Sequence, residues 1–174
     1  MAKDITTFFK IDVPEENDKT LIAFCDGSSI DNGKPHCRCG FAVVWPYHSD
    51  FDSSVKIREG QKTNNRAEYS ALYHTMVLAD TIDPEGGKTL IVYTDSMLLI
   101  NSLTKWIEGW KKNNWKKSDG YPVLNQDLLK LLDEKRKQRN LVLRHVRAHT
   151  GKDTWEAKWN DKVDRMARAA ALGK

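Results

Sequence analysis

Short apolar runs that end at turn-forming residues predict five β-strands. The strands are expected at residues 21–25, 41–45, 55–58, 90–94 and 141–146. The first run ends at Asp26-Gly27-Ser28, which we interpret as a strand running into a turn. Residues 90–94 are almost continuously apolar, which is typical of a central strand buried on both faces.

Helical spacing of apolar residues predicts helices after the third strand. Thr63, Asn64 and Asn65 supply polar groups that cap a helix start, and apolar residues then recur every three or four positions. Further helices are predicted at about residues 96–106, after Pro122, and at roughly 156–172. The order of elements indicates an α/β fold with a five-stranded mixed sheet flanked by helices. Connections between parallel neighbours should be right-handed.

The length and composition indicate one globular domain. The 174 residues are 40% hydrophobic and 30% charged, with a net charge of +4 that alone is weak evidence for a polyanionic partner. We expect a polar leader at residues 1–19, for which disorder is one interpretation, and a domain at residues 20–174. The leader is acidic and no apolar run could cross a membrane, which argues against a secretory signal, a mitochondrial presequence or a membrane partner. A cytoplasmic monomer is expected.

The three cysteines are Cys25, Cys37 and Cys39. An odd number without a signal peptide argues against a disulfide framework. His36 beside Cys37 and Cys39 suggests zinc, but no second ligand pair occurs at zinc-site spacing. We interpret the cysteines as reduced structural thiols.

Acidic residues at predicted element ends suggest a metal site. Asp26 and Asp95 follow predicted strands, Glu68 lies in the first turn of a helix, and Asp164 lies in the last helix four residues after Asn160. The carboxyl ends of strands are where sites form in open α/β sheets. Clustered carboxylates repel each other unless a divalent cation is present, and oxygen ligands suit Mg²⁺ or Mn²⁺. Two such ions about 4 Å apart serve in-line phosphoryl displacement.

Each acid also has an ordinary structural interpretation when it is taken alone. Asp26 fits a turn, Glu68 a helix N-terminus, and Asp95 a helix cap. Asp164 fits an ion pair within its own helix. The spacing by itself does not choose between these interpretations and a metal site.

Four motifs around these acids occur in a characteristic order. They are Cys25-Asp26-Gly27-Ser28, Thr63-Asn64-Asn65-Arg66-Ala67-Glu68, Tyr93-Thr94-Asp95-Ser96, and His149-Thr150-Gly151 followed by Asn160-Asp161-Lys162-Val163-Asp164. Together they closely resemble type 1 ribonuclease H, of the bacterial type with a basic protrusion, over residues 21–171. The resemblance implies a ribonuclease H-like fold. It also implies an endonuclease that hydrolyses the RNA strand of RNA/DNA hybrids and leaves 3′-hydroxyl and 5′-phosphate ends.

The resemblance assigns roles to individual residues. Asp26, Glu68, Asp95 and Asp164 are expected to be catalytic and to bind two Mg²⁺ ions when substrate is present, with Asp26 between them and Mn²⁺ able to substitute. His149 is expected on a mobile loop that assists proton transfer or product release. The expected substrate-binding residues nearby are Ser29, Asn32, Asn64, Asn65, Ser96 and the site-supporting Asn160. The 2′-hydroxyl is the group by which such a site distinguishes RNA from DNA.

A tryptophan- and lysine-rich stretch is the candidate for recognition of the DNA strand. Between Lys105 and Lys117 the chain carries five lysines against Glu108 alone. The candidate contacts are Trp106, Trp110, Lys111, Lys112, Trp115, Lys116 and Lys117. Lysines on phosphates make binding salt-dependent, and tryptophan faces pack on sugars or bases. We expect Trp106 to point inward and the other two tryptophans to lie nearer the substrate.

Two residues depart from the family pattern and several alternatives stay open. Met97 stands where bacterial members commonly have Gln, and Asp31 adds a charge that repels phosphate. Trp155 has no explanation from the sequence. The alternatives are a ribonuclease H domain of a reverse transcriptase, a proofreading exonuclease, a catalytically inactive hybrid-binding module, and a small-molecule phosphohydrolase. The exonuclease is disfavoured because Gly27 and Ser28 follow Asp26, where such enzymes usually carry a second acid.

Overall fold

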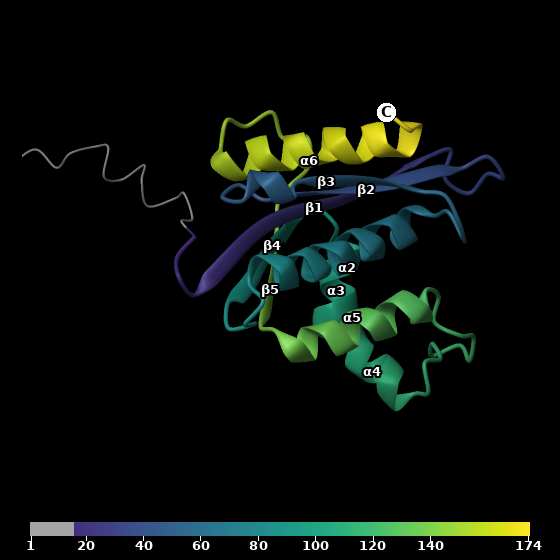
Figure 1. Cartoon of the computed structure of the whole chain (residues 1–174). Helices are drawn as coiled ribbons and strands as arrows, with labels where there is room; N and C mark the ends of the chain where they lie inside the picture. The colour runs from purple at the N-terminus through teal and green to yellow at the C-terminus, as the bar shows by residue number, and fades with distance from the viewer. Residues whose placement is uncertain (1–15) are drawn as a thin grey trace, which may run out of the picture.

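A five-stranded mixed sheet forms the middle layer of the computed structural model, which describes residues 16–174 (Figure 1). The strands are β1 (Thr20–Ile30), β2 (Arg38–Val44), β3 (Ser53–Ile57), β4 (Thr89–Thr94) and β5 (Leu141–His145). Their order is β3-β2-β1-β4-β5. The β1–β2 and β2–β3 pairs are antiparallel, whereas β1–β4 and β4–β5 are parallel. The predicted five-stranded mixed sheet is therefore confirmed.

The first strand is longer than the sequence predicted. The prediction that β1 ends at a turn beginning with Asp26 is wrong, because β2 pairs with β1 as far as Ile30↔Arg38. The parallel neighbour β4 stops earlier, at Phe24↔Tyr93. Asp26 therefore lies within β1, just beyond the last residue of β1 that pairs with β4.

Helices cover both faces of the sheet. Figure 1 shows α6 (Trp155–Leu172) on one face and α2 (Asn64–Ile82) on the other. Beyond α2 lie α3 (Met97–Asn101), the π-helical turn η2 (Ser102–Trp106), α4 (Ile107–Lys112) and α5 (Gln126–Gln138). A short 3₁₀ helix, η1 (Ser49–Phe51), precedes β3.

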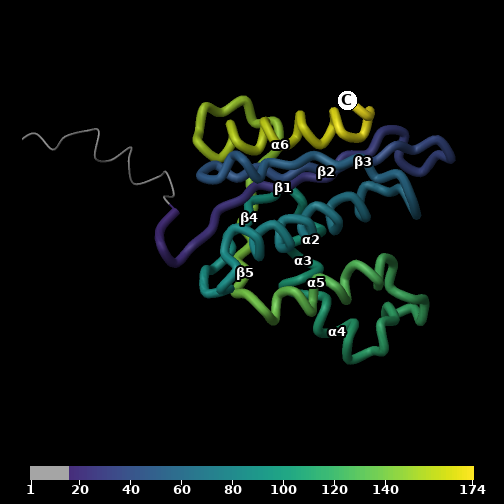
Figure 2. Tube along the Cα trace, in the orientation of Figure 1, coloured from purple at the N-terminus to yellow at the C-terminus, as the bar shows by residue number. Residues whose placement is uncertain are grey.

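The helix predicted to end near residue 106 continues to Lys112, so its predicted end is wrong. The π-helical turn η2 joins α3 directly to α4. Figure 2 follows the chain from α4 through the connecting loop into α5 at one edge of the molecule. The predicted cap at the start of α2 is confirmed, because Thr63 Oγ1 accepts a hydrogen bond from the Arg66 N–H at 3.2 Å.

Two glycines allow a helix to touch the sheet on each face. A Cβ atom at Gly27 would lie 2.5 Å from the backbone nitrogen of Glu68 in α2. A Cβ atom at Gly40 would lie 2.4 Å from the backbone nitrogen of Ala171 in α6. Both values are below the closest approach that real Cβ atoms show. A side chain at either position would force the helix away from the sheet.

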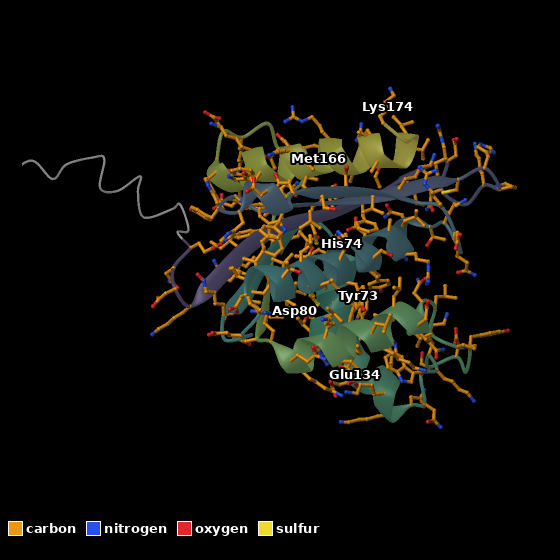
Figure 3. All side chains as sticks on the ribbon, in the orientation of Figure 1. Tyr73, His74, Asp80, Glu134, Met166 and Lys174 are labelled. Atoms are coloured by element: carbon orange, nitrogen blue, oxygen red, sulfur yellow. The ribbon has the colours of Figure 1, made fainter. Side chains whose placement is uncertain are left out.

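The core lies between the sheet and its helices. Trp155, at the start of α6, packs edge-on against Phe24 and Tyr93, with ring centroids 5.4 and 5.9 Å away. This contact supplies the explanation that the sequence lacked, because Trp155 holds α6 against β1 and β4. On the opposite face, His74 of α2 lies beneath the sheet and contacts Ser53 Oγ through Nε2 at 3.0 Å (Figure 3).

The predicted leader falls partly outside the described residues, which begin at Glu16. The Glu16 carboxylate accepts a hydrogen bond from the Ile22 N–H at 3.0 Å and pairs with His48. Residues 16–19 therefore contact the domain, and its predicted start at residue 20 stays a prediction. Among residues 16–174, every helix is too short or too polar to cross a bilayer.

Candidate active site

Three carboxylates from different elements meet at one end of the sheet. Asp26 comes from β1, Glu68 from the first turns of α2, and Asp95 from the residue after β4. One carboxylate oxygen of each lies within 4.8 Å of the others. The contact between Gly27 and the α2 backbone seats Glu68 beside Asp26. The first three acids predicted from the sequence are thus brought together.

Asp26 and Glu68 are buried and Asp95 is partly buried, and burial is the main influence on the protonation of all three. Burial, followed by the charges of Glu68 and Asp95, raises the pKa of Asp26 to about 10. Burial and the charge of Asp95 raise the pKa of Glu68 to about 8, although a hydrogen bond from the Gly27 backbone acts to lower it. Burial also raises the pKa of Asp95. Without a cation, the cluster therefore holds protons at neutral pH.

The fourth acid approaches the cluster from α6. Asp164 lies outside the group of three, and one carboxylate oxygen is 3.6 Å from Arg168 Nη2. It still interacts with Asp26 and contributes to the raised pKa of that carboxyl. One helical turn earlier, buried Asn160 donates a hydrogen bond from Nδ2 to Asp95 Oδ2 at 3.4 Å. Asn160, predicted from the motif to support the site, thus contacts one of the three clustered acids.

Two buried oxygens at the site fit the coordination of a cation. Glu68 Oε2 and Asn160 Oδ1 are buried and have no hydrogen-bond partner among the described residues. An unpaired buried oxygen is costly, whereas a cation or its water shell would satisfy it. Because all the donors are oxygens, the residues fit a hard divalent cation of the Mg²⁺ or Mn²⁺ type.

His149 lies on the exposed loop between β5 and α6. Its backbone φ of 52° is in the left-handed region, which is uncommon for residues other than glycine. Its charge acts on Asp95 in the direction that lowers the pKa of that carboxyl. The imidazole is therefore within electrostatic reach of the cluster.

Three of the predicted substrate-binding residues line a surface pocket. Asn32, Asn64 and Asn65 border a pocket of about 280 Å³ between the β1–β2 turn and the start of α2. Asn32 Oδ1 accepts a hydrogen bond from the Asn64 N–H at 3.1 Å, which holds the two segments together. Ser29 is paired in the sheet opposite Cys39, and Ser96 Oγ caps α3 by accepting from the Leu99 N–H at 3.2 Å.

The tryptophans of the basic stretch are arranged differently from the prediction. The expectation that Trp106 points inward is wrong, because Trp106 is 41% exposed. Ile107 is fully buried and takes the inward position, while Trp110 and Trp115 pack against the core. The register of the continuous helix through η2 and α4 produces this exchange.

The lysines of the same stretch divide into two kinds. Lys111 Nζ lies 3.1 Å from a carboxylate oxygen of buried Asp133, so it has a structural partner. Lys117 pairs with Asp119 at 3.6 Å. Lys112 and Lys116 are exposed and have no ion pair among residues 16–174. Together with Lys105, which is also exposed and has no ion pair among these residues, they are the lysines of this stretch best placed to meet an external anion.

The cysteines are unpaired and buried. Cys37 Sγ and Cys39 Sγ lie 3.6 Å apart. The predicted reduced structural thiols agree with this arrangement.

Comparison with known proteins identifies relatives over nearly the whole chain. The family model described as RNase H matches residues 18–172. Ribonuclease H1 of Mus musculus is 32% identical over 153 residues, which is 88% of this chain and 50% of the mouse protein. Ribonuclease H of Tropheryma whipplei (strain Twist) is 34% identical over 151 residues, 87% of this chain and 84% of that protein. The chain thus spans about half the length of the mammalian relatives it matches.

Solved structures share the fold at lower sequence identity. A foamy viral protease-reverse transcriptase in complex with dsDNA aligns with a TM-score of 0.72 and 17% identity, over 90% of this chain and 97% of that chain. LC11-RNase H1 in complex with RNA/DNA hybrid aligns with a TM-score of 0.61 and 20% identity, over 88% and 98% respectively. These likenesses support the ribonuclease H-like fold that the motifs implied.

Proposed function

Because the chain belongs to the ribonuclease H family, we propose that it is an endonuclease that hydrolyses the RNA strand of RNA/DNA hybrids. The observation that carries the proposal is the cluster of Asp26, Glu68 and Asp95 within 4.8 Å. Two unpaired buried oxygens, Glu68 Oε2 within the cluster and Asn160 Oδ1 next to Asp95, support a bound cation there. The proposed products carry 3′-hydroxyl and 5′-phosphate ends.

The four acids would hold two divalent cations, proposed as Mg²⁺ with Mn²⁺ able to substitute. Bound there, the cations would neutralise the carboxylates and activate the attacking water. Asn160 orients Asp95 through its amide, and Gly27 positions Glu68 through close backbone contact. We assign His149 to proton transfer at the leaving oxygen or to product release, which its place near Asp95 supports.

Substrate contacts are proposed on both sides of the acids. Asn32, Asn64 and Asn65 would contact the hybrid from their shared pocket, Ser29 from β1, and Ser96 from the start of α3. Trp106, Lys112 and Lys116 would meet the DNA strand, since all three are exposed and neither lysine has an ion-pair partner among residues 16–174. All the acids come from one chain, which supports action as a monomer. The unpaired thiols suit a reducing compartment, which supports a cytoplasmic location.

Asp95→Asn tests the metal-site role. We expect cleavage to fall by at least about 10³-fold, equivalent to about 4 kcal/mol of transition-state stabilisation, while hybrid binding survives. Asp161→Asn is the matched control, because Asp161 is an exposed acid one residue from Asn160 and outside the cluster. Equal losses of binding and cleavage in Asp95→Asn, or an equal loss of cleavage in the control, would count against the proposal.

A further inference from the structure

A basic pocket, separate from the asparagine pocket, lies between the end of β5 and the start of α6. It has a volume of about 460 Å³ and is formed by the end of β5, the following loop and the start of α6. Its lining includes Tyr93, Arg144, Arg147, Lys152, Thr154 and Glu156. None of the residues that define the metal site or the asparagine pocket lines it.

The cations of this pocket have no carboxylate partner in the described part of the chain. Arg144, Arg147 and Lys152 form no salt bridge with any carboxylate among residues 16–174, although Lys158 nearby pairs with Asp153 at 3.0 Å. Glu156 is the single acid among the lining residues. The pocket therefore has an excess of positive charge that the described protein does not neutralise, and an anion would neutralise it.

Arg144 is held in place by an aromatic ring. Its guanidinium lies 5.9 Å from the centroid of Tyr93, and Nη1 donates a hydrogen bond to the Tyr93 hydroxyl at 3.3 Å. Tyr93 is buried and stacks on Phe24, so the ring is a rigid support. A guanidinium that is positioned in advance loses less freedom when it binds an oxyanion, and its planar fork suits phosphate.

The start of α6 adds a second favourable feature. Thr154 caps the helix by accepting a hydrogen bond from the Ala157 N–H at 3.2 Å, and both residues line the pocket. The N-terminus of an 18-residue helix carries partial positive charge, which favours a bound anion. The helix end and the three unpaired cations therefore favour the same type of ligand.

We propose that this pocket binds a phosphate group. Its location favours an internucleotide phosphate of the bound hybrid as the source, and to that extent the inference rests on the proposed function. Ala157 lines the pocket, and Asn160, one turn further along α6, contacts Asp95. His149 lies in the loop between Arg147 and Thr150, which also line it. A strand at the acids is thus adjacent to the pocket, whose volume accommodates a phosphate with its attached sugar.

The test measures hybrid binding as a function of salt. Fluorescence anisotropy of a labelled RNA/DNA hybrid is recorded in EDTA over a range of KCl concentrations, so that no cleavage occurs. The pocket variant is Arg144→Gln/Arg147→Gln. The control variant, Lys19→Gln/Lys88→Gln, removes the same amount of charge at the opposite end of the parallel strands, where Thr20 pairs with Thr89. We expect the pocket variant to bind about tenfold more weakly at low salt. The slope of log K against log salt should fall in magnitude by about 1. The control should change neither the affinity nor the slope appreciably.

Glu156→Gln should act in the opposite direction and tighten hybrid binding, because it removes the acid of the pocket. Arg144→Gln removes a contact with Tyr93 and could lower the thermal unfolding midpoint for that reason alone. The second pocket variant, Arg147→Gln/Lys152→Gln, keeps that contact and is measured in the same way. An unchanged salt slope in both pocket variants excludes the hybrid backbone as the source.

The alternative source is a free phosphate group, which is tested by titration with inorganic phosphate and with adenosine 5′-monophosphate. Saturable shifts of the Thr150 and Lys152 amide resonances in the wild type, lost in the pocket variant, would assign the pocket to a free phosphate group. The proposal is overturned if neither the salt slope nor these resonances respond. A wild-type protein that binds the hybrid without cleaving it under Mg²⁺ would refute the proposed function and leave this binding test intact.

Discussion

Gly27→Ala should disable the site by moving the helix that carries Glu68. The added Cβ would lie 2.5 Å from the Glu68 nitrogen and 2.6 Å from the Ala67 carbonyl carbon. Both are backbone atoms, so no side-chain rotation relieves the contact. The start of α2 must retreat by about 0.5 Å to reach 3.0 Å, and by about 0.9 Å to reach the 3.4 Å of ordinary contact.

The retreat is large compared with what a metal site tolerates. Mg²⁺ binds oxygen at about 2.0–2.1 Å in a near-octahedral arrangement, and a displacement of about 1 Å in a catalytic group costs about 10²-fold in rate. A loss of about 10²-fold corresponds to about 2.7 kcal/mol in the barrier. The same overpacking should cost about 1–3 kcal/mol of folding stability.

Gly40→Ala is the matched control because it creates an equivalent clash on the other face of the sheet. Its Cβ would lie 2.4 Å from the Ala171 nitrogen, near the end of α6 and away from Glu68. Both variants should lose similar stability in urea unfolding, whereas only Gly27→Ala should lose about 10²-fold in kcat/KM on a labelled hybrid. Gly27→Ala with nearly full activity, or equal activity losses in the two variants, would refute the reasoning.

The remaining predictions concern protonation and the basic stretch. Metal-free protein should lose stability as pH rises from about 4 to about 8, because folded Asp26 and Glu68, with pKa values raised to about 10 and about 8, keep protons that the unfolded chain releases. Asp26→Asn should flatten that dependence and stabilise the metal-free protein at pH 7 by at least about 1 kcal/mol, since each unit of pKa shift corresponds to about 1.4 kcal/mol. Urea unfolding in EDTA measures both effects, and stability that rises with pH would contradict them. Lys112→Gln/Lys116→Gln should weaken hybrid binding and reduce its salt slope by up to about 2 with little change in stability. Lys111→Gln should instead lower stability by about 1–3 kcal/mol, because it leaves the buried carboxylate of Asp133 with one fewer partner. Anisotropy and urea unfolding of both variants test whether Lys112 and Lys116 serve binding while Lys111 serves stability.

Local signals in the sequence predicted the elements and the acids well. Thr63 caps α2 as its hydroxyl suggested, since capping depends on residues three positions apart. Asp95 directly follows β4, and Asp26 lies just past the part of β1 that pairs with β4, so their approach follows from the strand order. Glu68 follows because α2 starts against β1 at Gly27.

The predictions that were wrong depend on contacts between distant residues. The extension of β1 past Asp26 comes from pairing with β2, which an apolar pattern within one strand does not report. The inward position expected for Trp106 is filled by Ile107, because the packing of this helix against the core sets which side chain faces inward. Trp155 had no interpretation because its partners Phe24 and Tyr93 lie far away in the chain.

The basic pocket could not be predicted from the sequence for the same reason. Arg144, Lys152 and Glu156 are close in sequence, but only the fold shows that they surround one cavity. The hydrogen bond from Arg144 to Tyr93 joins β5 to β4, and it is visible only once the strand order is known.

The most direct test of the central claim is cleavage of one labelled RNA strand presented in three forms: an RNA/DNA hybrid, duplex RNA and single-stranded RNA. Each form is incubated with Mg²⁺ and, separately, with chelator. We expect internal cuts in the hybrid alone, only with Mg²⁺, and products with 3′-hydroxyl and 5′-phosphate ends. Tight hybrid binding without any cut in Mg²⁺ or Mn²⁺ would contradict the claim and would favour a hybrid-binding module that has lost catalysis.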